Sequence, residues 1–141
     1  MNFFRCYLTL LIFIQFTLAQ FRLLFPAPRG NSEVNQLIPP CGAYDITNQS
    51  RTQVPLETPF VEIDSELDVY NYSIHAIVGN NPSSADFFGT SSSYISVASG
   101  TRDHANASCL QFSFPQNISS GTNATLQVVY NSSNGIYFQV K

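Results

Sequence analysis

Apolar and polar residues alternate with a period of two along much of the chain after its first 20 residues. The clearest run covers residues 67–78, where Asn71, Ser73 and His75 occupy the polar positions. Because successive side chains of a strand point to opposite faces, this pattern predicts a strand with one buried face. The residues expected on that inner face are Tyr70, Tyr72, Ile74, Ala76 and Val78.

Six further short segments have the composition of strands and are separated by clusters of Gly, Pro, Asn and Ser. They are residues 21–25, 60–63, 94–97, 109–114, 124–130 and 136–140. Residues 31–36, 86–93 and 100–108 are predicted to be loops. Since no helical period follows residue 20, the sequence predicts an all-β protein, an antiparallel β-sandwich.

The first 20 residues differ from the rest of the chain. Arg5 is followed by an apolar run over residues 6–16 and then by the small-residue exit Thr17-Leu18-Ala19. This layout is typical of a secretory signal peptide, and the apolar run is short for a membrane span of about 20 residues. An uncleaved anchor helix is the alternative. We expect a signal peptide at 1–19 and one secreted domain at 20–141, with Gln20 as its first residue and no transmembrane segment.

Charge and composition fit an extracellular protein. Without Arg5 the chain has five basic and nine acidic residues, a formal net charge of −4. A chain with this net negative charge is not expected to bind nucleic acid or anionic lipid. Six Asn-x-Ser/Thr sequons predict a glycoprotein. They begin at Asn48, Asn71, Asn106, Asn117, Asn123 and Asn131.

Two of the three cysteines, Cys41 and Cys109, follow the predicted signal peptide. In an oxidising compartment the simplest interpretation is one disulfide, which stabilises a long loop by up to about 4 kcal/mol. Two free thiols, buried as inert core residues, are the alternative.

The search for catalytic motifs finds no G-x-S-x-G nucleophile turn, no H-E-x-x-H zinc motif and no phosphate-binding glycine loop. Asp103-His104 is the one adjacent acid–histidine pair. His75 is expected on the same strand face as the sequon residue Asn71. This favours a solvent-facing or cross-strand histidine over a metal ligand. We therefore predict that the chain is not an enzyme.

Five motifs in order connect the chain to a known family. They are F-x-L-x-x-P-x-x-R-G at residues 21–30, P-C-G at 40–42, R-T-Q-V-P-L at 51–56, F-V-E-I at 60–63 and G-x-x-A-T-L-Q-V-V-Y at 121–130. In these motifs the chain resembles the fungal copper-acquisition factors, small secreted proteins related in fold to lytic polysaccharide monooxygenases. The resemblance implies an immunoglobulin- or fibronectin-III-like sandwich, on a protein often attached to the cell surface by a lipid anchor.

The resemblance also implies copper as the bound ion and a copper-uptake partner at the cell surface. Family members hold copper with the amine and ring of an N-terminal histidine, a second histidine and an aspartate. Imidazole nitrogen is a natural copper donor. The implied function is extracellular copper binding and uptake, not polysaccharide oxidation.

This chain departs from the family at each ligand. Gln20 stands where the family has histidine, and an N-terminal glutamine that cyclises to a lactam loses its amine donor. The second histidine would fall near Glu66, and His75 lies farther along the strand. Gln20, Glu66 and His75 are thus weak substitute candidates for copper ligands, and a chain without copper is the alternative.

The family ending L-Y-x-C-A-D begins at residues 136–139 and is cut short by Val140 and Lys141. We therefore expect a C-terminally truncated chain without a lipid-anchor signal. Two functions remain open. One is a copper-binding secreted or cell-surface glycoprotein with degraded ligands, and the other is a metal-free secreted β-sandwich with a recognition or structural role.

Overall fold

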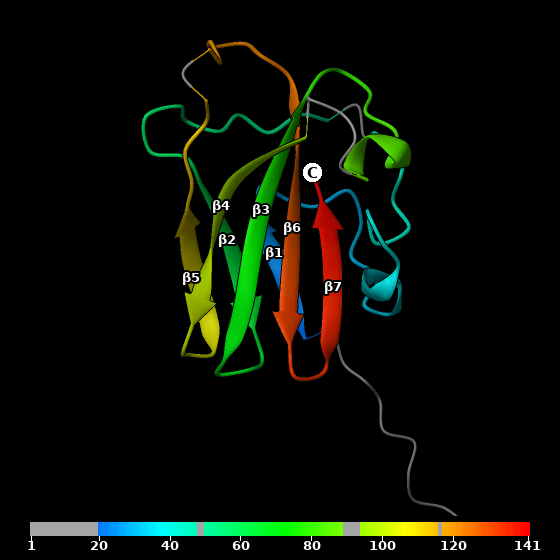
Figure 1. Cartoon of the computed structure of the whole chain (residues 1–141), viewed down its shortest axis with the longest axis vertical. Coiled ribbons are helices and arrows are strands. Elements are labelled where there is room, and N and C mark those ends of the chain that lie inside the picture. The colour runs from blue at the N-terminus through cyan, green and yellow to red at the C-terminus, as the bar shows by residue number, and fades with distance from the viewer. Residues whose placement is uncertain (1–19, 48–49, 89–93, 116) are drawn as a thin grey trace, which may run out of the picture.

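The computed structural model describes residues 20–47, 50–88, 94–115 and 117–141, which form two antiparallel sheets (Figure 1). The predicted signal peptide and the sequon at Asn48 lie outside the described residues. The strands are β1 (Phe21–Phe25), β2 (Phe60–Ser65), β3 (Tyr70–Val78), β4 (Tyr94–Arg102), β5 (Asn106–Gln111), β6 (Ala124–Ser132) and β7 (Gly135–Val140). Two single-turn 3₁₀ helices are η1 (Val34–Leu37) and η2 (Ser84–Phe87).

The sheets have the strand orders β1-β2-β5 and β4-β3-β6-β7. Phe21 pairs with Ser65, and Ser65 pairs with Asn106 on the next strand. The turns at 66–69, 103–105 and 133–134 therefore lie at the same end of the sandwich as Gln20, and we call this the N-terminal end (Figure 1). The opposite end, the C-terminal end, carries the segments 50–59 and 112–123 together with Lys141.

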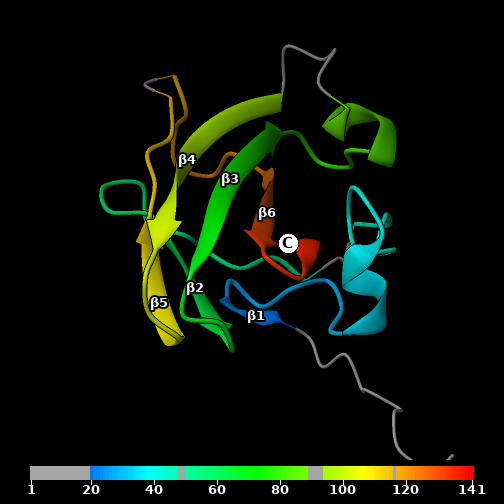
Figure 2. The same cartoon turned by 60° about the horizontal axis from the view of Figure 1, so that its bottom comes forward.

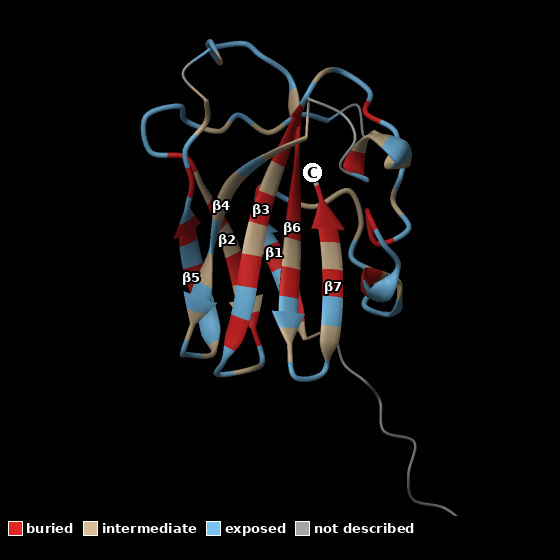
Figure 3. Cartoon of the chain, in the orientation of Figure 1, coloured by how far each residue is buried: buried red, intermediate tan, exposed pale blue. Residues whose placement is uncertain are grey.

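The core lies between the two sheets and confirms the predicted register of β3. Tyr70, Tyr72, Ile74 and Ala76 are buried, whereas Asn71 is exposed (Figure 3). The facing sheet contributes the buried side chains Phe21, Leu23, Val61, Ile63 and Leu110. The predicted β-sandwich is thus present as two packed antiparallel sheets.

The alternation fails at the upper end of β3. Ile77 is buried and Val78 is 38% exposed, the reverse of the prediction. The reason is a second apolar cluster, formed by Ile77 with Cys41, Phe87 and Val140, on the outer face of the four-stranded sheet. The segments that contain η1 and η2 lie beside that sheet near β7 and cover it there (Figure 2). Both faces of the sheet are therefore apolar at this end.

Strand boundaries differ most in the predicted loop at 100–108. β4 continues to Arg102 and β5 begins at Asn106, so only three residues form the turn. Gly100 lets the Tyr72 ring pack against the backbone, because a Cβ there would meet the Tyr72 hydroxyl at 2.9 Å. Arg102 lies over the same ring at 5.4 Å from its centroid. A tyrosine from β3 thus supports a segment whose own composition is typical of a loop.

The predicted disulfide between Cys41 and Cys109 is not formed, and both are free thiols. Cys41 lies in the buried cluster behind the four-stranded sheet, whereas Cys109 is exposed on β5, between the inward residues Ser108 and Leu110. Burial, followed by the charge of Asp45, raises the pKa of the Cys41 thiol to about 12. Cys41 is therefore a neutral core residue.

Among the described residues, no helix has both the length and the apolar character needed to span a membrane.

Candidate functional site

The N-terminal end brings together two of the three residues predicted as copper ligands. The main-chain N–H of Glu66 donates to the carbonyl oxygen of Gln20 at 3.1 Å, one step beyond the Phe21–Ser65 pair. The Gln20 side chain accepts a hydrogen bond from Nδ2 of Asn134 at 2.9 Å. Gln20 is thus held between the β2–β3 turn and the β6–β7 turn, and Glu66 is its neighbour.

Aromatic packing fixes this end of the chain. Phe21 is fully buried and stacks on Tyr130 with ring centroids 4.8 Å apart, and Tyr130 stacks on Tyr70 at 4.6 Å. Tyr130 belongs to the four-stranded sheet and Phe21 to the three-stranded sheet. The stack therefore joins the two layers directly behind Gln20.

A buried hydroxyl network shapes the turn that carries Glu66. Ser65 Oγ donates to the carbonyl of Leu67 at 2.9 Å and accepts from its N–H at 3.1 Å. It also bonds the hydroxyl of Tyr130 at 2.8 Å. Burial raises the pKa of the Tyr130 phenol, and this effect exceeds the opposite one of the hydrogen bond with Ser65. The phenol therefore remains a neutral hydrogen-bonding partner.

His75, the third predicted ligand, lies elsewhere. Its neighbours Ile74 and Ala76 face the core, so His75 is on the outer face in the middle of β3. The imidazole stacks on Tyr94 at 4.6 Å, and its Nε2 is 3.1 Å from Oγ of Ser73. Burial lowers its pKa. This is the cross-strand histidine that the sequence favoured, and the core separates it from Gln20 and Glu66.

His104, which was not among the predicted ligands, also lies at the N-terminal end. It is exposed in the β4–β5 turn, where its Nδ1 is 3.1 Å from the carbonyl of Ala105. The Asp103-His104 pair was the available signal, and it carried no information on which end of the fold the turn occupies. Within the described ranges, no three His, Cys, Asp or Glu side chains are grouped as metal ligands.

The sequon asparagines that the structure describes share one property, exposure to solvent. They are Asn71, Asn106, Asn117, Asn123 and Asn131. Asn71 and Asn131 are directly paired across β3 and β6. The positions are thus accessible on the folded surface, and whether they carry sugar stays a prediction.

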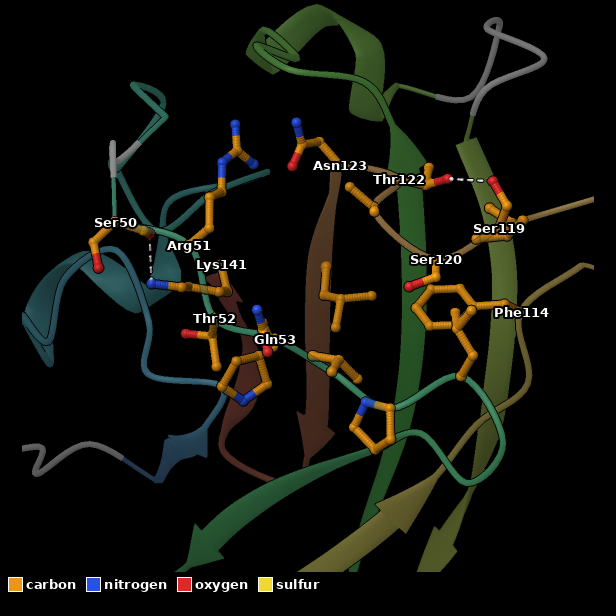
Figure 4. Close-up of a pocket in the computed structure, with 18 of the residues that line it drawn as sticks. Ser50, Arg51, Thr52, Gln53, Phe114, Ser119, Ser120, Thr122, Asn123 and Lys141 are labelled. Atoms are coloured by element: carbon orange, nitrogen blue, oxygen red, sulfur yellow. Dashed lines mark hydrogen bonds between the residues drawn. The ribbon is translucent and has the colours of Figure 1, made fainter.

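A pocket of about 690 Å³ opens at the C-terminal end, between segment 50–56 and segment 118–124 (Figure 4). Arg51 and Lys141 line one side, and Phe114 and Ser120 line the other. Phe114 is held edge-on to the buried Phe112, with ring centroids 4.9 Å apart. The pocket thus has a wall supported by aromatic packing, and it lies at the end of the sandwich opposite to Gln20.

The chain matches a known protein family over almost the whole described domain. The model of the family described as copper acquisition factor, BIM1-like, matches residues 18–139. No curated protein matches the chain. The family match covers both sheets, the N-terminal end and nearly all of the last strand. The chain belongs to the family of BIM1-like copper acquisition factors.

Proposed function

We propose that this chain is a secreted or cell-surface glycoprotein that acts in extracellular copper binding and uptake, with a reduced set of copper donors. Family membership supports the copper-related role over polysaccharide oxidation. The observation that supports a reduced donor set is the distance between the candidate ligands in the fold. Gln20 and Glu66 are joined by a hydrogen bond at one end, and His75 is stacked on Tyr94 across the core.

The chemistry of the remaining donors supports weak binding. After cleavage at Ala19, the amine of Gln20 and the carboxylate of Glu66 would be neighbours, and the imidazole of His104 is on the same end. Cu(II) binds nitrogen and oxygen donors more strongly than other divalent first-row ions, so such a set retains some affinity. Two adjacent donors do not enclose an ion, and a lactam at Gln20 would remove one of them.

Other features support the proposed fold type and location. Lettered in chain order, the two sheets correspond to A-B-E and C′-C-F-G, an arrangement that supports a fibronectin-III-like sandwich. The exposed sequon asparagines and the signal-like start of the sequence support a secreted glycoprotein. A copper-uptake partner at the cell surface is part of the same proposal and rests on the family alone.

Isothermal titration calorimetry with Cu(II) tests the donor set. The protein beginning at Gln20 is compared with its Gln20→His variant, which restores an N-terminal imidazole beside Glu66. We expect the variant to bind one copper ion at least about 100-fold more tightly, a gain of about 2.7 kcal/mol. Tight one-to-one binding by the unmodified protein would contradict the reduced donor set.

Two controls sharpen the titration. Glu66→Gln in the Gln20→His background is expected to lower the affinity again, whereas His75→Gln is expected to leave it unchanged because His75 lies across the core. If Gln20→His gains nothing, the second function is favoured, a metal-free recognition protein. The pocket at the C-terminal end is the observation that supports this second function.

A further inference from the structure

Positive charge is concentrated at the pocket of the C-terminal end. Of the five basic residues that follow residue 19, Arg29, Arg51 and Lys141 line it, although the same part of the chain has a formal net charge of −4. None of the acidic residues in the described chain lines this pocket. An acidic protein thus presents a cationic hollow at one end.

The three cations have neutral oxygens as their hydrogen-bond partners. Arg29 Nη2 donates to Thr125 Oγ1 at 2.6 Å, and Lys141 Nζ donates to the carbonyl of Ser50 at 3.1 Å. Arg51 donates to the carbonyl of Asn80. Arg22, at the other end of β1, instead forms an ion pair with Asp64 at 2.8 Å. For Arg51 and Lys141, these carbonyl partners orient the cations without an ion pair, whereas Arg29 also has the charge of Asp45 nearby.

Arg29 is fixed in place by both its main chain and its side chain. Its main-chain N–H donates to the carbonyl of Val140 at 2.9 Å, and its side chain bonds the buried Thr125. Nε of Arg29 is buried and has no hydrogen-bond partner. Burial lowers the pKa of this guanidinium, whereas the nearby Cys41 and Asp45 act in the opposite direction and Arg51 in the same one. Arg29 is thus a half-buried cation that supports the two pocket cations nearer to solvent.

The rest of the lining defines the kind of anion. Hydroxyl and amide groups surround the cations, and prolines, Leu126 and Phe114 supply apolar surface. The polar lining residues include Thr52, Gln53, Ser119, Ser120, Thr122 and Asn123. A volume of about 690 Å³ is in the usual range for small-molecule sites. Sugar rings match such a surface because they present hydroxyl groups at their edges and C–H groups on their faces.

We propose that this pocket binds a short acidic saccharide, whose carboxylates pair with Arg51 and Lys141 and whose hydroxyl groups bond the surrounding side chains. Guanidinium and ammonium groups form their strongest hydrogen bonds with such anions. The site is at the end of the sandwich opposite to Gln20 and Glu66, so the proposal stands independently of copper binding.

Calorimetry with trigalacturonate tests the site, with neutral maltotriose as the matched uncharged probe. The secreted protein is used with its N-glycans trimmed to a single N-acetylglucosamine, because Asn123 is at the pocket rim. We expect one-to-one binding of trigalacturonate that weakens with added salt, and at least tenfold weaker binding of maltotriose. Absence of trigalacturonate binding, or equal binding of the two sugars, would overturn the proposal.

Variants locate the site on the protein. Arg51→Gln and Lys141→Gln are each expected to weaken trigalacturonate binding about tenfold, the loss of about 1.4 kcal/mol. Arg22→Gln makes the same charge change far from the pocket and is expected to leave the affinity within about twofold. Equal effects of Arg22→Gln and Arg51→Gln would show a nonspecific charge effect and overturn the site. Inorganic phosphate that binds as tightly as the sugar would overturn the saccharide assignment.

Discussion

The hydroxyl of Ser65, at the N-terminal end, bonds Tyr130 and both main-chain groups of Leu67, whereas Arg51 and Lys141, at the C-terminal end, each bond a main-chain carbonyl. The Ser65 hydroxyl is buried, and its hydrogen-bond partners all belong to the fold. Arg51 and Lys141 are charged groups beside an open pocket. Internal bonding of buried polar groups fixes the shape of one end, and partial bonding of the pocket cations leaves donors at the other end that could bond a ligand.

The largest expected effect is the loss of the aromatic stack at the N-terminal end. Phe21→Ala removes a fully buried ring that stacks on Tyr130, so we expect the free energy of unfolding to fall by about 3–5 kcal/mol. Chemical denaturation followed by tyrosine fluorescence measures it. Leu24→Ala, at a 44% exposed position on the same strand, is the control and should cost less than half as much. Equal losses would show that β1 is not anchored by this stack.

An intermediate effect is expected from the hydroxyl network. Ser65→Ala leaves the buried Tyr130 hydroxyl and the N–H of Leu67 without their partner, which should lower the free energy of unfolding by about 1–3 kcal/mol. The exposed Ser99 provides the control Ser99→Ala, expected to change stability by less than about 0.5 kcal/mol. Denaturant titrations of the two variants make the comparison. Identical curves would mean that the network does not shape this turn.

The smallest expected effect belongs to the C-terminal end. Arg51→Gln removes an exposed cation that bonds a carbonyl, so the free energy of unfolding should change by less than about 0.5 kcal/mol. Thermal unfolding of Arg51→Gln beside the unmodified protein measures this. A large loss would assign Arg51 a structural role and remove the contrast between the two ends.

Most of the sandwich could be predicted from local sequence, since alternation and turn residues determine which segments become strands. The register of Tyr70, Tyr72 and Ile74 followed from period two alone and is confirmed. The burial of Ile77 could not be predicted in this way, because the cluster on the outer face joins it to Cys41 and Val140, which are far from it in the sequence, and to Phe87 of η2. Tertiary contact also supports β4 up to Arg102, where Tyr72 packs against Gly100.

The candidate site was predictable only in part. Gln20 and Glu66, predicted as substitute donors, are adjacent, but the presence of His104 at the same end depends on which turns share an end of the sandwich. Neither alternation nor spacing contains that information. Similarly, the cationic pocket combines Arg29, Arg51 and Lys141, which are far apart in the sequence and meet only after both sheets form.

The burial of Phe21 has a consequence for the order of events during biosynthesis. If the signal peptidase cuts after Ala19, the bond that it cleaves is two residues from a fully buried ring in a paired strand. Peptidases act on extended, accessible chain, so cleavage would have to precede the docking of β1. Cleavage and the docking of β1 would then compete, because a chain that docks β1 first withdraws this bond from the peptidase.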